Sequence, residues 1–220
     1  RIEISAVIGS LDIGDEERVD TNTNYYLDLD EADSGGPIGL AGPVLGSFFA
    51  FKFKQIAQLT PTGNVGQPYS MKFIAKSIGA ATSRSIVRGE DQSGNPCLYW
   101  MSHRGPCRWG IFGLEYIGRN VEDLLLGPTS TMYVTGQDNR LAFSVYFQDK
   151  RQVWFWVTSN SGFASSRILL MYDVINGGWS RFVGGPQTGT CAVMFSNTLG
   201  ASMAIDLKPY VGDIGSVPSP

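Results

Sequence analysis

The chain has 220 residues, of which 43% are hydrophobic and 12% aromatic, with 27 glycines and 11 prolines. This hydrophobic content can supply a sizeable core for one all-β domain or two small ones, and it argues against wholesale disorder. The formal net charge of −3 argues against a general nucleic-acid binder, because such proteins are usually basic.

In chain order, short apolar or alternating runs punctuated by glycine predict strands along almost the whole sequence. The chain begins with Arg1 inside the first predicted strand and ends in SVPSP, so we expect it to be a piece of a longer polypeptide. No run of 18 apolar residues predicts a transmembrane helix, and no signal peptide is recognisable. In the first half, the predicted strands cover residues 2–8, 25–29, 38–40, 46–53, 54–59, 69–75 and 85–88.

Turn chemistry predicts three hairpins in the second half. Gly105 and Gly177 can supply the positive φ that tight hairpin turns require. The hairpins join residues 97–101 to 108–112, residues 141–147 to 152–158, and residues 168–173 to 178–183. Further short strands are predicted over residues 114–116, 191–195 and 202–207.

One short helix is predicted over residues 118–126, in the sequence GRNVEDLLL. Asn120 is placed as its N-cap, and Glu122 and Asp123 are in its first turn, where carboxylates are favourable. Gly127 and Pro128 are expected to end it.

Three segments share a strand–turn–strand outline and begin near residues 46, 95 and 141. Their spacing of about 45 to 50 residues is typical of four-stranded propeller blades. The sequence therefore predicts an all-β fold of antiparallel sheets arranged as the blades of a full or partial propeller, with a β-sandwich as the alternative.

The cysteines Cys97, Cys107 and Cys191 are odd in number and have no CxxC spacing, which argues against a disulfide framework and a structural zinc site. A bridge between Cys97 and Cys107 across their hairpin is conceivable. Because free cysteine packs as a small hydrophobe, we favour buried free thiols.

Candidate catalytic groups are few. The single histidine, His103, falls on a predicted hairpin tip without a triad partner or an HExxH motif, and we interpret it as an exposed loop residue. Glycosidases need two converging carboxylates, and no pair stands out by sequence. The carboxylates weighed for this role are Glu115, Glu122, Asp123 and Asp173, the last of which we expect to cap its own turn.

Two loops resemble ligand sites only superficially. The glycine-rich run 35–46 lacks GxxxxGK[ST], and its small residues are better suited to the inner strand of a blade. The acidic run 27–36 contains Asp28, Asp30, Glu31 and Asp33 but lacks the EF-hand order, so a solvated turn is favoured over a calcium site. We predict no catalytic, cofactor-binding or metal-binding residues.

Aromatic and basic residues also have a structural and a functional interpretation. Trp154 and Trp156 alternate onto one strand face, which favours packing between blades over sugar stacking. The same interpretation covers Tyr99, Trp100, Trp109 and Trp179. The basic residues Arg104, Arg108, Arg119, Lys150 and Arg151 are interpreted as a solvated surface rather than a nucleic-acid site.

A wider pattern covers residues 46 to 183. The sequence shows Ile78-Gly79-Ala80, then Leu98-Tyr99-Trp100, the short Gly118 helix, Val153-Trp154, Tyr172-Asp173 and Trp179-Ser180, in that order. This order resembles β-propeller structural proteins of tailed bacteriophages, found in tail, neck and nozzle assemblies. His103-Arg104 departs from the pattern, which has an acidic residue before Gly105.

The resemblance implies a β-propeller-like domain over residues 1–206, with about three to four blades, followed by a C-terminal linker over 207–220. It implies a non-enzymatic virion component that helps to form or gate the DNA exit path and is assembled in the host cytoplasm. Its partners would be other tail or neck proteins and copies of itself around the tail axis, with passing contact with viral DNA and none with a membrane. The alternatives are a carbohydrate-binding domain that recognises a host surface and, less favoured, a glycosidase fragment.

Overall fold

A computed structural model describes residues 2–5, 24–27, 29, 37–64, 67–126, 142–158, 167–182, 189–196 and 207–213. These residues form antiparallel sheets, together with one short helix, α1 (Glu122–Leu126), and short 3-10 turns. The prediction of an all-β fold is confirmed.

Three of the sheets are four-stranded meanders in which each strand pairs with the next one along the chain. Meander 1 consists of β3 (Pro37–Val44), β4 (Ser47–Lys52), β5 (Ile56–Asn64) and β6 (Gln67–Ala75). Meander 2 consists of β7 (Val87–Glu90), β8 (Pro96–Ser102), β9 (Gly105–Gly110) and β10 (Gly113–Tyr116). Meander 3 consists of β11 (Phe143–Phe147), β12 (Gln152–Thr158), β13 (Arg167–Asp173) and β14 (Trp179–Phe182).

Two further sheets have two strands each and stand at the ends of the chain. The N-terminal pair is β1 (Ile2–Ser5) with β2 (Asn24–Leu27), and the C-terminal pair is β15 (Gly189–Ser196) with β16 (Leu207–Asp213).

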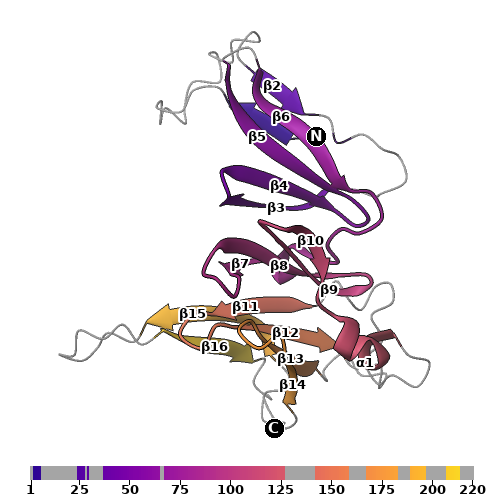
Figure 1. Cartoon of the computed structure of the whole chain (residues 1–220), viewed down its shortest axis with the longest axis vertical. Coiled ribbons are helices and arrows are strands. Elements are labelled where there is room, and N and C mark those ends of the chain that lie inside the picture. The colour runs from indigo at the N-terminus through magenta and orange to yellow at the C-terminus, as the bar shows by residue number, and fades with distance from the viewer. Residues whose placement is uncertain are drawn as a thin grey trace, which may run out of the picture.

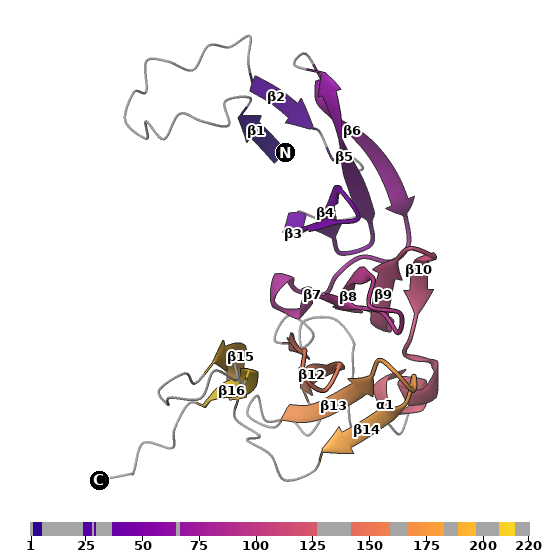
Figure 2. The same ribbon diagram turned by 60° about the vertical axis from the view of Figure 1, so that its left-hand side comes forward.

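The sheets are stacked face to face in chain order (Figure 1). The first strands of successive sheets contact one another, β3 with β7, β7 with β11, and β11 with β15. Figure 2 shows the stack as an arc, with β3 and β7 on its concave side and β6 and β10 on its convex side. Successive propeller blades are arranged in this way. The described residues do not close a ring, so the propeller stays a prediction.

Meander 2 has an apolar core on each of its faces, because alternate residues of β8 point to opposite sides. Leu98 and Trp100 pack toward meander 1 with Phe49, Phe51 and Cys107. Cys97, Tyr99 and Met101 pack on the other face with residues of meander 3, among them Val153, Phe155 and Leu170. A two-layer sandwich would leave one face of each sheet without such a core, which favours the stacked arrangement over the sandwich alternative.

The two end sheets lie against part of each outer face of the stack. On meander 1, Ala50, Ala57 and Leu59 form a core with Leu29, which follows β2. On meander 3, the outer-face core includes Ala192, Met194 and Val211 of the C-terminal pair. Its residues on meander 3 are Phe143, Val145, Trp156 and Leu169, with Trp154 and Met171 partly buried.

The connection from β6 to β7 crosses meander 1 at very short range. The Ala80 N–H donates to the Lys52 carbonyl at 3.0 Å, and the Trp100 indole N–H donates to the Gly79 carbonyl at 3.0 Å. A Cβ on Gly79 would lie 1.9 Å from the Lys52 oxygen, so only glycine fits at this crossing. These contacts hold the first two meanders in a fixed relation.

The predicted hairpins β8–β9, β11–β12 and β13–β14 are confirmed. The prediction of Asn120 as an N-cap is wrong. Asn120 lies inside a 3-10 turn, Arg119–Val121, whose cap is Gly118 and has no side-chain hydrogen bond. The turn starts there because the Val121 N–H donates to the Gly118 carbonyl, and burial of Val121 and Leu125 anchors the segment in the core.

The C-terminal boundary also differs from the prediction. The sequence predicts a strand over 202–207 with a linker after it, whereas β16 covers Leu207–Asp213 and pairs with β15. Proline within a run usually argues against a paired strand. Pro209 nevertheless lies opposite Met194, and Val211 packs into the core with Ala192. Residues 214–220 lie outside the described part of the chain.

Candidate functional site

The most elaborate polar site of the described residues lies at the turns of meander 2. The turn between β7 and β8 is organised by Asp91, whose carboxylate accepts the backbone N–H groups of Ser93 and Asn95, both at 2.8 Å. Burial pushes the pKa of Asp91 upward, but the hydrogen bonds from Asn95 and Ser93 outweigh it and hold that pKa below its usual value. Asp91 is therefore an ionised turn anchor.

A cross-strand ladder runs beside this turn. Arg108 on β9 lies directly opposite Tyr99 on β8 and Glu115 on β10, and its guanidinium forms an ion pair with the Glu115 carboxylate. Burial works against the charge of Arg108, but the hydrogen bond with Glu115 outweighs it and raises the Arg108 pKa. The buried Tyr99 hydroxyl donates to the Glu90 carbonyl at 2.8 Å, and burial raises its pKa. Arg108 and Glu115 thus neutralise each other.

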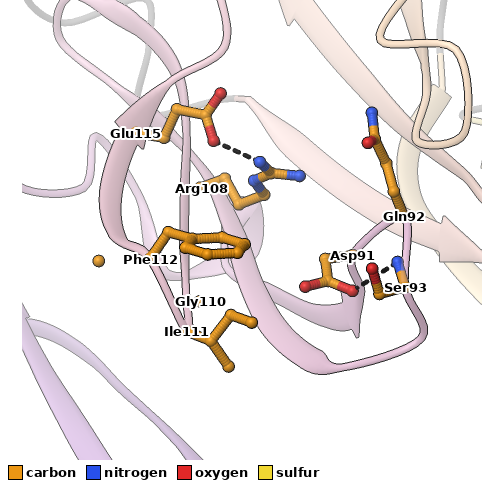
Figure 3. A pocket seen from close by; sticks show the side chains of 9 residues that line it. Asp91, Gln92, Ser93, Arg108, Gly110, Ile111, Phe112 and Glu115 are labelled. Carbon is orange, nitrogen blue, oxygen red and sulfur yellow. Dashed lines mark hydrogen bonds and ion pairs between the residues drawn. The ribbon is translucent and has the colours of Figure 1, made fainter.

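Asp91, Arg108 and Glu115 line a pocket of about 60 Å³, shown in Figure 3. Its wall is completed by the β9–β10 turn, in which Ile111 is 48% and Phe112 89% exposed. Sites for small organic ligands usually measure at least about 300 Å³. The pocket is therefore a polar dimple beside an exposed aromatic ring, and its carboxylates are already engaged.

Arg151 links the turns of meanders 2 and 3. Its guanidinium donates to the Asp91 carbonyl, and its own carbonyl accepts the Val174 N–H at 3.0 Å. Arg151 has a φ of 50°, the left-handed region that side chains rarely adopt. It acts as a brace between the β7–β8, β11–β12 and β13–β14 turns.

Asp173 caps its own turn, as predicted. Its carboxylate accepts the N–H groups of Ile175 at 2.9 Å and Asn176 at 3.1 Å, and it also accepts the Asn176 side-chain amide. These hydrogen bonds, with those from Asn176 the largest, lower the pKa of Asp173. Of the other glycosidase candidates, Glu115 pairs with Arg108, while Glu122 and Asp123 are exposed in the first turn of α1.

His103 lies in the β8–β9 turn as predicted, but the expectation that it is exposed is wrong. The ring is half-buried against Phe53, with the ring centres 5.2 Å apart. Its Nδ1 is buried without a hydrogen-bond partner. Burial, and next the charge of Arg104, lower the pKa of His103, so the ring is neutral near pH 7.

The aromatic residues serve mainly as packing between sheets. Trp100 and Tyr99 are fully buried, and Trp156 stacks on Phe143 with ring centres 4.8 Å apart. Trp154 shares the face of Trp156, as alternation predicted. Trp109 and Trp179 are partly buried and pack against the cores.

The prediction of buried free thiols at Cys97 and Cys107 is confirmed. Cys97 and Cys107 are buried free thiols in different cores, on opposite faces of meander 2, so a bridge between them is excluded. Burial raises the pKa of both thiols to about 11. Cys191, which stands apart from the other two in the sequence, is free and exposed on the C-terminal pair.

The structure describes most of the glycine-rich run 35–46 but not the acidic side chains of the run 27–36. The run 35–46 supplies β3, the first strand of meander 1, as its small residues indicated. Gly39 in this strand passes close to Ser83, since a Cβ there would lie 3.1 Å from the Ser83 Cβ. Asp28, Asp30, Glu31 and Asp33 lie outside the described residues.

Among the described residues, no three His, Cys, Asp or Glu side chains gather in a way that could hold a metal ion. The same part of the chain has no helix long and apolar enough to cross a membrane. The chain matches no known family and no curated protein.

The sequence interpretation missed the Asp91–Arg108–Phe112 grouping. The Asp-Gln-Ser-Gly-Asn run signals an Asx turn, and this signal could have located Asp91. Its proximity to Arg108 and Phe112 depends on the pairing of four strands, which no local pattern provides.

Proposed function

We propose that the chain is a non-enzymatic structural component of a tailed-bacteriophage virion, positioned in the tail, neck or nozzle assembly. The observation that carries the structural role is the stack itself. Successive four-stranded sheets share apolar cores on both faces, and their first strands follow one side of an arc. Such a body is rigid and presents turns at the edges of its sheets. The phage setting rests on the sequence resemblance alone.

The chemistry of the turns supports a scaffolding role over catalysis. Asp91 and Asp173 are engaged by backbone N–H groups, and Glu115 is paired with Arg108. General acid–base catalysis needs a positioned group that is free to exchange a proton with substrate. These side chains instead fix the shape of the turns that would meet neighbouring subunits.

In this proposal, the propeller-like body lines or gates the DNA exit path, and its partners are tail or neck proteins and copies of itself. The net negative charge suits a conduit, because phosphates would be repelled rather than retained. Tight binding of duplex DNA at moderate salt would count against this role.

The test is mass spectrometry of purified virions from the phage that encodes the chain. The proposal predicts its peptides in particles banded on a density gradient, at several copies per portal ring. Recovery only from the soluble lysate, with none in the particles, would contradict it.

One observation favours a second candidate function, carbohydrate recognition. Phe112 is 89% exposed beside the polar groups of Arg108 and Gln92, and sugars stack on such rings. A glycan array would show saturable binding that Phe112→Ala abolishes. The pocket volume of about 60 Å³ makes this the weaker proposal.

A further inference from the structure

The described sheets at the two ends of the stack are half-sized. Each meander has four strands, whereas the N-terminal pair and the C-terminal pair have two each. β15 contacts β11, the first strand of meander 3, so the C-terminal pair occupies the first two positions of a sheet. β2 contacts β6, the last strand of meander 1, so the N-terminal pair occupies the third and fourth positions.

The two pairs are therefore complementary halves of one meander. In the order β15–β16–β1–β2, every neighbouring pair would be antiparallel. The chain would also pass from the fourth strand of one sheet, β2, to the first strand of the next, β3, as it does from β6 to β7. β16 and β1 would meet through edges that carry no strand among the described residues.

The outer faces of the stack are covered only in part. On each face, the uncovered area is where the missing half of a four-stranded sheet would lie. On meander 1, Leu40 of β3 lies opposite Ala50, on the face toward the N-terminal pair, yet it is 58% exposed. On meander 3, Phe182 of β14 lies opposite Leu169, on the face toward the C-terminal pair, and it is 48% exposed. Each lies on the half of its face that the two-stranded sheet does not reach.

The C-terminal pair also has an apolar face turned away from the stack. Ala192 and Met194 pack on meander 3, so Val193, between them, points to the other side. Val193 is 59% exposed, and Tyr210, directly opposite it on β16, is 45% exposed. A sheet with both faces apolar is suited to lie between two others rather than at the end of a stack.

We propose that the C-terminal pair of one copy and the N-terminal pair of a second copy join edge to edge into a composite four-stranded sheet. β16 would hydrogen-bond with β1 of the second copy. Val193 and Tyr210 would then pack on Leu40 of the second copy, and its N-terminal pair would cover Phe182. The joint is head to tail, so it builds a ring of copies if the rotation closes and a filament if it does not.

A second copy offers the complementary half, whereas the two pairs of one chain stand at opposite ends of the arc, with three meanders between them (Figure 2). Bringing them together within one chain would require the meanders to rotate on their shared cores. Those cores are closely packed and contain Trp100, Tyr99 and Phe155, all fully buried. The inference does not depend on the phage setting.

Sedimentation of the full-length protein tests the joint. The wild type should form species of two or more copies. Leu40→Arg damages the N-terminal end, and Phe182→Arg damages the C-terminal end. Each variant should raise the dissociation constant of the joint about 100-fold or more, because each buries an unpaired charge. A mixture of the two variants should give dimers and nothing larger, since one undamaged joint remains. Phe112→Arg, at an exposed turn away from both ends, is the matched control and should assemble like the wild type.

A cross-link separates the two possible occupants. In Leu40→Cys, the new thiol should oxidise with the exposed native Cys191 of another copy and give dimers and larger species on a non-reducing gel. Phe112→Cys should give no such ladder. The proposal would be overturned by a monomeric wild type, or by Phe112→Cys giving the same ladder of cross-linked species as Leu40→Cys. A disulfide formed within single chains would also overturn it, by showing that the arc closes on itself.

Discussion

Gly79→Ala is the sharpest test of how the stack is held together. Gly79 lies where the β6–β7 connection crosses meander 1. A methyl group there would lie 1.9 Å from the Lys52 oxygen and 2.7 Å from the Phe53 carbonyl carbon and oxygen. All three atoms are backbone, so no side-chain rotation can relieve the overlap.

The expected cost follows from what must give way. Over-packing of a close-packed site costs about 1 to 3 kcal/mol. Displacing the connection also breaks the Ala80–Lys52 hydrogen bond and disturbs the one between Trp100 and Gly79, which leaves buried groups unpaired at about 1 to 3 kcal/mol. Against this, alanine stabilises by about 0.4 to 1 kcal/mol through the unfolded chain. The free energy of unfolding should therefore fall by about 1 to 5 kcal/mol, and by about 3 kcal/mol at the centre of these ranges.

Urea unfolding followed by tryptophan fluorescence measures this change, and the midpoint should fall by roughly 1 M or more. The matched control is Gly178→Ala, at a glycine where an added Cβ meets nothing within 4 Å. That variant should stay within about 0.5 kcal/mol of the wild type. Equal midpoints for the two variants would refute the account of the crossing.

Three further predictions concern the core, the thiols and a turn. Trp100→Phe should destabilise the fold by about 2 to 4 kcal/mol, because it removes a buried hydrogen bond and leaves a cavity. Trp154→Phe should cost about half as much or less, and urea unfolding measures both. A thiol reagent at pH 8 should label Cys191 first in the native protein, since the two buried thiols have pKa values of about 11, and all three thiols in urea. Asp173→Ala should lower stability at pH 7, because folding favours the ionised carboxylate. That difference should shrink as the pH falls below 3.8, the ordinary pKa, toward the lower value in the folded protein.

Each of these has a clear contrary result. Equal costs for the two tryptophan variants would show that the indole hydrogen bond to Gly79 contributes little. Simultaneous labelling of all three thiols in the native state would show that the cores open readily. A constant stability difference for Asp173→Ala between pH 7 and pH 3 would show that its charge does not contribute.

Local patterns predicted the hairpins because each signal lies within a few residues of its effect. The Asn176-Gly177 turn was predictable from its positive φ preference, and φ at Gly177 is 66°. The alternation of Trp154 and Trp156 was enough to assign their shared face. Two sequence predictions failed because long-range contacts decide the structure there. Residues 207–213 pair with β15 instead of forming a linker, and the burial of Val121 fixes the segment around Asn120.

The order of the sheets and the site at the meander 2 turns could not be read from the sequence. Asp91, Arg108 and Phe112 come from different strands and turns, and they are brought together by the register of β7 to β10. The half-covered end faces depend on which strand of one sheet lies over which strand of the next. Such long-range contacts have no periodic signal.

We propose that the stacked sheets form part of a structural ring in a phage particle. Electron microscopy of the full-length protein in its native virion tests it most directly. The account predicts copies around the tail or portal axis, with β3, β7 and β11 nearest the inner side of each arc. Particles without the protein, or density showing a two-layer sandwich at that place, would contradict it.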